Sequence, residues 1–279
     1  MKDNIILVNS CDAYEDVWEL FFCAFQEYWP ECKYRVILNT ENKKFTSTKV
    51  DLHTHNFNSP DGRDMWGLRL KQTLIECQSK YVVMLYDDFV LEGNVDQDQI
   101  VKCAKWLDEN PEVAVFYFIN NPANKNIDDR RFDNFELIPT KGDFKLNSAP
   151  AIWRRKKLLE FIDDNDTPWA WEFFGSYRTY SSTDLFYCVQ REHEDIYPYN
   201  YITGGAIYRG KWVRRIVVPL INKYNLRIDL NDRGLTDGVM KKDKRTLLWK
   251  INFFLLGFKM IKFGIILFIY RILIKKFLT

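Results

Sequence analysis

Two adjacent acids close the most hydrophobic strand that the body of the sequence predicts. The run Tyr81–Tyr86 predicts a buried strand, and Asp87 and Asp88 follow it directly. Neighbouring side chains inside a strand point to opposite faces, so two acids there would not flank one bond as a glycosidase pair does. At the turn just past the strand, both can reach one site. Carboxylates in that position suit Mg²⁺ or Mn²⁺, which takes further ligands from waters and substrate phosphates. The alternative is an acidic turn or helix cap that binds no metal.

The elements that would position these acids alternate between strand and helix through the first 120 residues. This alternation predicts an α/β fold with a mostly parallel sheet flanked by helices. The expected strands are Ile5–Val8, Tyr34–Leu38, Lys49–His53, Tyr81–Tyr86 and Val113–Ile119, and the expected helices are Tyr14–Trp29, Asp64–Cys77 and Asp98–Asp108. Ligands bind such sheets at the carboxyl ends of the strands. The polar residues at three strand ends are therefore expected near one site: Ser10, Cys11 and Asp12, then Asn39 and Thr40, then Asp87 and Asp88.

Composition bounds the class of protein. The chain has 279 residues, of which 47% are hydrophobic and 28% charged, which predicts a substantial core and excludes disordered and fibrous classes. Its six cysteines form no C-x-x-C pair. That spacing argues against a structural zinc site and a secreted disulfide framework, and it favours a reducing cytoplasm. We expect one domain over residues 1–240 and a tail over residues 241–279.

Charge separates this tail from the body of the chain. Residues 241–279 carry a net charge of +9, and the first 240 residues carry −7. An acidic body argues against nucleic-acid binding, whereas a basic, apolar tail suggests an anionic membrane surface. The longest stretches of the tail without a charge, Ile251–Phe258 and Phe263–Tyr270, have eight residues each, too few to span a bilayer. We expect Gly257 and Gly264 to break the tail into short helices that lie on the membrane surface.

Three segments together resemble a known family. The strand with its acid pair, the Trp66-x-x-Arg69-Leu70 helix before it and the later Trp169-Ala170-Trp171-Glu172 segment are similar to bacterial GT-A fold glycosyltransferases that assemble capsular or lipopolysaccharide glycans. The resemblance covers most of residues 4–215, and Tyr86-Asp87-Asp88 stands where such enzymes carry a D-x-D motif. It implies transfer of a sugar from a nucleotide-diphosphate donor, with Mn²⁺ or Mg²⁺ as cofactor.

The resemblance also implies roles for individual residues. Asp88 is the expected metal ligand, with Asp87 touching ribose or a metal-bound water and His193 as a further candidate ligand. The expected donor-binding residues are Ser10, Cys11, Asp12, Asn39, Thr40, Trp66, Arg69 and Asp87. For Arg69, contact with a phosphate competes with a position on a solvated helix face.

An inverting transfer needs a base that takes the proton of the acceptor hydroxyl, and a carboxylate held among apolar rings has a suitable pKa. Glu172 fits this role best, because Trp169, Trp171, Phe173 and Phe174 surround it in the sequence. Trp169 and Trp171 are the expected stacking partners of the acceptor sugar. The alternative is a core segment with one acid pointing outward, and the sequence leaves inversion and retention both open.

A further motif partly matches the sequence pattern of a phosphate-binding loop. Residues 205–211 match G-x-x-x-x-G-K, but Trp212 stands where the loop requires Ser or Thr. We therefore reject a P-loop, and we expect Arg209 and Lys211 to close over a diphosphate from the far side of the site.

Two other functions compete with glycosyl transfer. A nucleotidyltransferase would share the strand-end acids and the metal, but it normally carries an early glycine-rich loop, which the sequence lacks between Val8 and Tyr14. A non-catalytic membrane adaptor would use the tail alone. The leading hypothesis is a glycosyltransferase, peripheral or monotopic on the cytoplasmic side of the cell membrane, that acts on a lipid-linked glycan acceptor.

Overall fold

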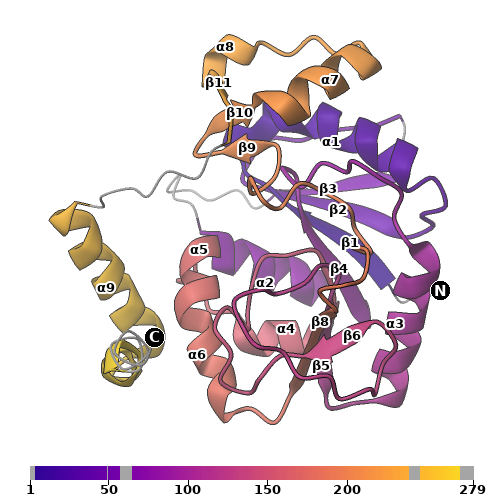
Figure 1. Cartoon of the computed structure of the whole chain (residues 1–279). Helices are drawn as coiled ribbons and strands as arrows, with labels where there is room; N and C mark the ends of the chain where they lie inside the picture. Colours follow the sequence, from indigo (N-terminus) through magenta and orange to yellow (C-terminus); the bar gives the residue numbers. More distant parts are fainter. Residues whose placement is uncertain (1–3, 49, 57–64, 239–245, 271–279) are drawn as a thin grey trace.

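A mixed eight-stranded sheet forms the centre of the protein (Figure 1). The computed structural model describes residues 4–48, 50–56, 65–238 and 246–270. The strand order is β3-β2-β1-β4-β7-β5-β8-β6. The strands are β1 (Asn4–Asn9), β2 (Arg35–Thr40), β3 (Leu52–Asn56), β4 (Tyr81–Tyr86), β5 (Val113–Tyr117), β6 (Phe135–Leu137), β7 (Ala151–Arg154) and β8 (Leu185–Val189). Only β6 and β7 run antiparallel to their described neighbours, which confirms the predicted α/β class with a mostly parallel sheet.

Helices cover both faces of this sheet because its central strands are apolar on both sides. In β1, Ile6 and Val8 belong to one buried cluster, whereas Ile5 and Leu7 belong to another on the opposite face. The helices α1 (Glu15–Tyr28), α3 (Gln97–Glu109) and α7 (Arg214–Tyr224) contribute to the first cluster, and α2 (Trp66–Glu76) and α4 (Arg155–Phe161) to the second. Each strand end is thereby fixed between two packed layers.

The order of the first eight elements follows the prediction, with two differences. The third strand lies at 52–56 rather than 49–53, and Lys49, its predicted first residue, is outside the described residues. This strand is polar and pairs only with β2, so the hydrophobic pattern defines its register weakly. The second difference is that the sheet contains two strands that were not predicted: β7, four residues long, lies antiparallel between β4 and β5, and β8 pairs parallel with β5.

The segment that imitates a P-loop is a β-hairpin. It consists of β9 (Ile207–Tyr208) and β10 (Lys211–Val213), which pair antiparallel, and β11 (Leu235–Thr236) completes a small second sheet. Arg209 and Gly210 form its two-residue turn with φ of 54° and 76°. A two-residue turn with both φ angles positive is typical of a type I′ hairpin, so the prediction against a P-loop is confirmed.

The small sheet is attached to the end of β4 by a close backbone approach. The amide of Ala206 donates to the carbonyl oxygen of Asp88 at 2.7 Å. Gly205 has a φ of +100°, and a Cβ at this position would lie 2.4 Å from the same Asp88 oxygen. Only glycine lets the hairpin come this close to the acid pair.

The described part of the tail packs against the body. Helix α9 (Leu247–Ile261) and a further helical stretch at 264–270 lie beside α5 (Pro168–Ala170) and α6 (Ser176–Arg178) (Figure 1). The predicted division of the tail into short helices is confirmed for the described residues, but the break predicted at Gly257 is wrong: α9 continues through Gly257, and the break falls at Lys262, with φ 51° and ψ −133°, two residues before Gly264. In the part of the chain described, no helix is both long and apolar enough to cross a bilayer. The predicted domain boundary at residues 240 and 241 lies outside the described residues.

We expect Gly205→Ala to destabilise the protein more than Gly204→Ala. Both glycines have positive φ, but a Cβ at Gly204 meets nothing within 4 Å, so that variant adds only backbone strain of roughly 1 kcal/mol. Gly205→Ala adds a clash with the Asp88 carbonyl, which raises the total to about 2 kcal/mol or more. Chemical denaturation measures both, and equal losses would contradict the close approach.

Candidate functional site

A cavity of about 300 Å³ opens at the carboxyl ends of β1 and β4. Its walls come from both strands, from the β1–α1 connection, from α2 and from the start of α5. The lining residues are Asn9, Ser10, Cys11, Tyr14, Trp66, Arg69, Tyr86, Asp87, Asp88 and Pro168. The structure thus brings the acid pair together with five of the other residues named from the sequence or its resemblance: Ser10, Cys11, Trp66, Arg69 and Tyr86.

Asp87 is held by hydrogen bonds from the protein. Its side chain is 3% exposed, and its Oδ2 atom accepts from the hydroxyl of Ser10 and from Trp18 Nε1, the latter at 3.1 Å. Trp18 Nε1 also lies 2.6 Å from the Ser10 oxygen, so the three side chains form one buried cluster. Burial raises the pKa of Asp87, and these two hydrogen bonds oppose part of that rise. Asp87 is therefore fixed in place by the fold.

Asp88 lies in a different electrostatic setting. Its side chain is half-buried and lines the cavity. Burial raises its pKa well above the ordinary value of 3.8, and the neighbouring Asp87 charge raises it further, with only its own backbone amide opposing them. In the described part of the chain, no cationic side chain compensates this carboxylate. Both raised pKa values favour the protonated carboxyls in the metal-free protein, and a cation entering the cavity would favour their charged forms.

Three residues of the cavity wall also carry a buried polar atom without a well-formed hydrogen bond among the described residues, although Trp66 and Ser148 still act on the pKa of Tyr86 as hydrogen-bond partners. The three atoms are Nδ2 of Asn9, Nε1 of Trp66 and the hydroxyl of Tyr86. Buried polar atoms normally have partners, so a cluster of unsatisfied ones in a cavity wall suits a ligand with oxygen acceptors. Together with two carboxylates, this set fits a hard divalent cation and a phosphate group.

The protein alone does not complete a metal site. No group of three or more His, Cys, Asp or Glu residues in the described ranges is arranged to hold a metal ion. His193 lies in an exposed turn that follows β8, three strands away from β4 in the sheet. A cation at Asp88 would take its other ligands from substrate and water, as Mg²⁺ commonly does.

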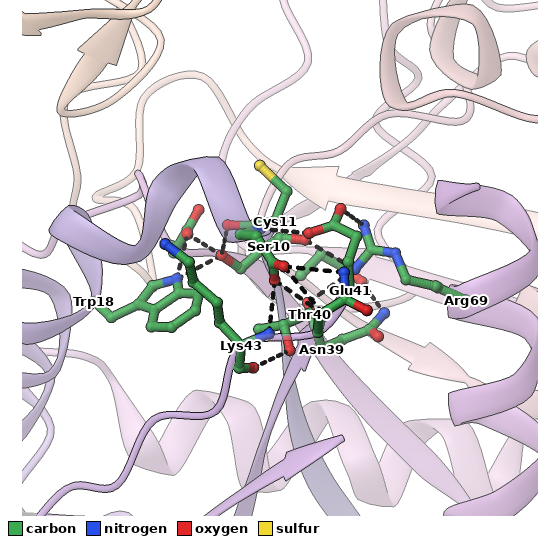
Figure 2. Close-up of polar contacts among 12 residues, drawn as sticks. Ser10, Cys11, Trp18, Asn39, Thr40, Glu41, Lys43 and Arg69 are labelled. Carbon is green, nitrogen blue, oxygen red and sulfur yellow. Dashed lines mark hydrogen bonds and ion pairs between the residues drawn. The ribbon is translucent and has the colours of Figure 1, made fainter. Parts of the chain in front are cut away.

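Arg69 fastens two strand ends together. The side chain is 2% exposed, and its Nη1 atom donates to the carbonyl oxygens of Ser10 at 3.0 Å and Asn39 at 3.2 Å (Figure 2). Its Nη2 atom pairs with Glu41 Oε1 at 3.0 Å. The guanidinium borders the cavity, but its charge is neutralised by Glu41. The alternative that Arg69 lies on a solvated helix face is therefore wrong. Its guanidinium contacts a phosphate only if the ion pair with Glu41 breaks.

Three other predicted donor-binding residues stabilise loops and do not line the cavity. The carboxylate of Asp12 accepts from the backbone amides of Asn42 and Lys43, and the hydroxyl of Thr40 donates to the Lys43 carbonyl (Figure 2). Asn39 is fully buried and donates to Asn9 Oδ1 at 3.2 Å. These hydrogen bonds use most of their polar atoms, although Oδ1 of Asn39 has no hydrogen-bond partner among the described residues, and their contacts with a donor stay predictions.

Cys11 and Tyr14 complete the cavity wall on the side of the β1–α1 connection. Burial, together with the charges of Asp87 and Glu41, raises the pKa of Cys11 to about 12. The thiol therefore stays protonated at neutral pH and is a poor nucleophile. Burial, together with the charges of Asp88 and Asp87, also raises the pKa of Tyr14.

Glu172 lies in a turn of π-helix over Trp171–Gly175. Its Oε1 atom accepts from the backbone amide of Ser148 at 2.7 Å, and burial raises its pKa. The charges of Glu172 and Asp88 both raise the pKa of Tyr86, a residue of the cavity wall. Glu172 is not among the residues that line the cavity, but its charge and that of Asp88 act on the same tyrosine, although 83 residues lie between the two acids in the sequence.

The two tryptophans beside Glu172 have structural roles. Trp171 is fully buried, packs on Trp66 with ring centroids 5.7 Å apart, and donates from Nε1 to the Phe161 carbonyl at 2.9 Å. It has no face left for an acceptor sugar, so the prediction for Trp171 is wrong. Trp169 is 41% exposed, but one face stacks on Phe253 of α9 at 4.3 Å.

The hairpin cations lie apart from the cavity. Arg209 and Lys211 are exposed at the hairpin turn, and neither is among the lining residues. A different arginine acts on the acids: Arg233 of α8 (Leu230–Arg233) pairs with Asp16, and its charge lowers the pKa of Asp87. Sequence reasoning missed it, because the Arg233–Asp16 pair joins positions 217 residues apart.

No protein-family model matches the chain, and no curated protein sequence matches it. Solved structures with a related arrangement include TarS of S. aureus in complex with UDP-GlcNAc, at 14% identity over 70% of this chain and 60% of that chain, with a TM-score of 0.42. A mannosyltransferase of Pyrobaculum calidifontis in complex with GDP-Man and Mn²⁺ matches at 15% identity over 57% and 46%, with a TM-score of 0.37. A cytidylyltransferase of Leptospira borgpetersenii matches at 10% identity over 70% and 79%, with a TM-score of 0.42.

The similar structures thus include both glycosyltransferases and nucleotidyltransferases. The matched part spans 59% of the TarS 1–349 chain, which is less than two thirds of its length. At these identities the likeness is one of fold.

We expect Asp88→Asn to raise the melting temperature of the metal-free protein. The folded pKa of Asp88 lies above its unfolded value, so the charged form opposes folding. This penalty is absent below the unfolded pKa of about 3.9 and grows as the pH rises, so the gain should be larger at about pH 8 than at about pH 4. Thermal unfolding in EDTA measures it, with Asp98→Asn, an exposed acid in the first turn of α3, as the matched control. A loss of stability at both pH values would favour a turn or cap role for Asp88.

Proposed function

We propose that the protein is a glycosyltransferase that moves a sugar from a nucleotide-diphosphate sugar to a glycan acceptor. The observation that carries this proposal is the uncompensated Asp88 carboxylate in a cavity whose walls hold unsatisfied donors. A nucleoside diphosphate with a divalent cation supplies both missing partners, since the cation neutralises the acids and the phosphate oxygens accept from the donors.

The proposed donor site uses the residues of the cavity wall. Asp88 would hold Mn²⁺ or Mg²⁺, and Asp87, fixed by Ser10 and Trp18, would orient the metal-bound water or the ribose. Asn9 and Trp66 would donate to phosphate oxygens. The cation supplies positive charge that stabilises the departing diphosphate.

Glu172 is the proposed base of an inverting transfer. The acceptor oxygen attacks the anomeric carbon, and the bond from that carbon to the diphosphate oxygen breaks. The nucleoside diphosphate leaves with the electron pair, and the hydroxyl proton passes to Glu172. Burial raises the pKa of this carboxyl, which makes it a better proton acceptor, and the Ser148 amide fixes its orientation.

The tail supports a membrane-bound acceptor. Its outward face exposes large apolar side chains, among them Leu247 (73%), Leu255 (51%), Phe263 (75%) and Ile266 (63%). Three exposed lysines lie among them, at 250, 259 and 262, and the sequence has no acid after Asp243. This combination is typical of a segment that lies on an anionic lipid surface.

The tail also lies next to the donor cavity. Pro168 lines the cavity and begins α5, and the next residue, Trp169, stacks on Phe253 of α9. We therefore propose that the enzyme lies on the cytoplasmic face of the cell membrane and glycosylates a lipid-linked glycan in capsule or lipopolysaccharide assembly.

We expect Glu172→Gln to abolish turnover and to preserve donor binding. The full chain is supplied with Mn²⁺ and a panel of UDP-, GDP- and dTDP-linked sugars, and release of the nucleoside diphosphate is measured. The variant should lose roughly 10²- to 10⁴-fold in rate, because the amide accepts no proton. Thermal stabilisation by the donor should remain. Glu160→Gln, an exposed acid on α4, is the matched control.

Other outcomes would redirect the assignment. Pyrophosphate formed from a nucleoside triphosphate and a sugar phosphate, with no turnover of any nucleotide sugar, would indicate a nucleotidyltransferase. No response to any nucleotide would favour the membrane adaptor.

We expect the outward face of the tail to bind anionic vesicles. Replacing Leu255 and Ile266 with serine should weaken flotation with phosphatidylglycerol vesicles more than tenfold. Burying each of these side chains in the lipid contributes about 1.5–3 kcal/mol to the binding free energy. The matched control replaces Ile75 and Ile202, which are 57% and 68% exposed on the body, with serine. Equal flotation of the two variants would show that the tail is not the membrane anchor.

A further inference from the structure

The inner face of the tail packs on the element that carries Glu172. Phe253 of α9 contacts three aromatic rings of residues 169–174, with centroid distances of 4.3 Å to Trp169, 5.5 Å to Phe173 and 4.6 Å to Phe174. Phe268, from the second helical stretch, adds contacts to Phe173 at 5.1 Å and Phe174 at 5.5 Å. The two residues that follow Glu172 therefore lie between the body and the tail.

Two glycines of the tail allow this contact. A Cβ at Gly257 would lie 2.6 Å from the ring of Phe174, and a Cβ at Gly264 would lie 2.7 Å from the ring of Tyr177. Gly257 is inside α9, where alanine would favour the helix by about 1 kcal/mol. The close approach of the Phe174 ring explains why a glycine is present at position 257. The tail packs here with Gly257 directly against Phe174.

A hydrogen bond from Arg178 also joins the tail to the body at this contact. Arg178 forms a two-point ion pair with the buried Asp166, and its Nη2 atom also donates to the carbonyl oxygen of Met260 at 3.5 Å. Arg178 follows the π-helical turn by three residues. The tail, the turn and the body thus meet at one arginine.

The turn that carries Glu172 depends on such support. A π-helical turn is rare and is retained where surrounding contacts favour it, often at functional sites. Ala170 and Phe174, on either side of Glu172, are buried in a cluster whose other buried members all come from the tail: Met260, Ile265 and Phe268. Without the tail this side of the turn would face water.

We propose that the docked tail is the positioning element for Glu172, acting through Gly257 and Phe174, so that the base is set for proton transfer only while the tail packs on the π-helical turn. This inference rests on the proposed function, because it takes Glu172 as the base. It adds that the membrane-binding segment also completes the catalytic geometry.

The groups that interact with Glu172 determine how its pKa would change if the π-helical turn moved. The backbone amide of Ser148 donates to the carboxylate of Glu172. The charge of Glu172 raises the pKa values of Tyr86, Tyr117 and Tyr199. The titratable groups that face it are therefore tyrosines, with Asp88 the other acid acting on Tyr86. Movement of the turn toward water would remove the burial that raises the pKa of Glu172.

The test substitutes Gly257 in the full-length protein in detergent micelles. Titration of ¹³C-labelled glutamate carboxyls reports Glu172, whose signal is assigned by its loss in Glu172→Gln. Gly257→Ala should lower this titration midpoint toward the value of a hydrated glutamate. Asn252→Ala, an exposed polar position on the same helix, should leave it unchanged. A midpoint in Gly257→Ala equal to that of the wild type would overturn the proposal.

A second variant keeps the test valid if Gly257→Ala disturbs more than the contact. Adding Phe174→Leu removes ring atoms that the new methyl group meets, so the double variant should recover most of the shift. Failure of this rescue would point to general disruption and would contradict the assigned contact. The titration needs no substrate, so its result stands apart from turnover: normal turnover of Glu172→Gln would remove the base assignment without altering the titration.

Discussion

The burial of two adjacent carboxylates at the end of β4 is the constraint on which the rest of the site depends. Charged groups away from water require partners, and Asp87 obtains them from Ser10 and Trp18. Asp88 obtains none from cationic side chains of the described residues, and its pKa rises accordingly. The charged form of Asp88 therefore lowers the free energy of unfolding of the metal-free protein. The arrangement becomes favourable once a cation and an anionic ligand enter the cavity together.

The surrounding structure keeps the carboxylates in place against this cost. Arg69 and Glu41 tie the ends of β1 and β2 together beneath the cavity. On the opposite side, the Ala206 amide and the side-chain-free Gly205 hold the backbone of Asp88. These contacts join segments that are distant in sequence, so the acids cannot relax apart without disturbing both sheets. Rigid support of this kind is what a preorganised charge-stabilising site requires.

The sequence predicted what depends on local patterns and missed what depends on long-range contacts. Apolar runs and their spacing placed the strands and helices as far as β5, and the acid pair marked the functional edge of the sheet. Asp12, Asn39 and Thr40 do not line the cavity as the sequence suggested, because nothing local shows that Asp12 and Thr40 hydrogen-bond the loop after β2 or that Asn39 bonds Asn9. Trp171 resembled a sugar platform and is a core residue. Arg233, Ser148 and the docking of the tail on Phe174 depend on tertiary packing that no single segment encodes.

The central claim is that a divalent cation and a nucleoside diphosphate complete this cavity together. Calorimetric titration of UDP and GDP into the full-length protein, with and without Mn²⁺, tests it most directly. The account predicts that one nucleotide binds tightly only with Mn²⁺, that Mn²⁺ binds more tightly when that nucleotide is present, and that Asp88→Asn abolishes this coupling. Equal nucleotide affinity with and without Mn²⁺, or coupling that survives in Asp88→Asn, would contradict it.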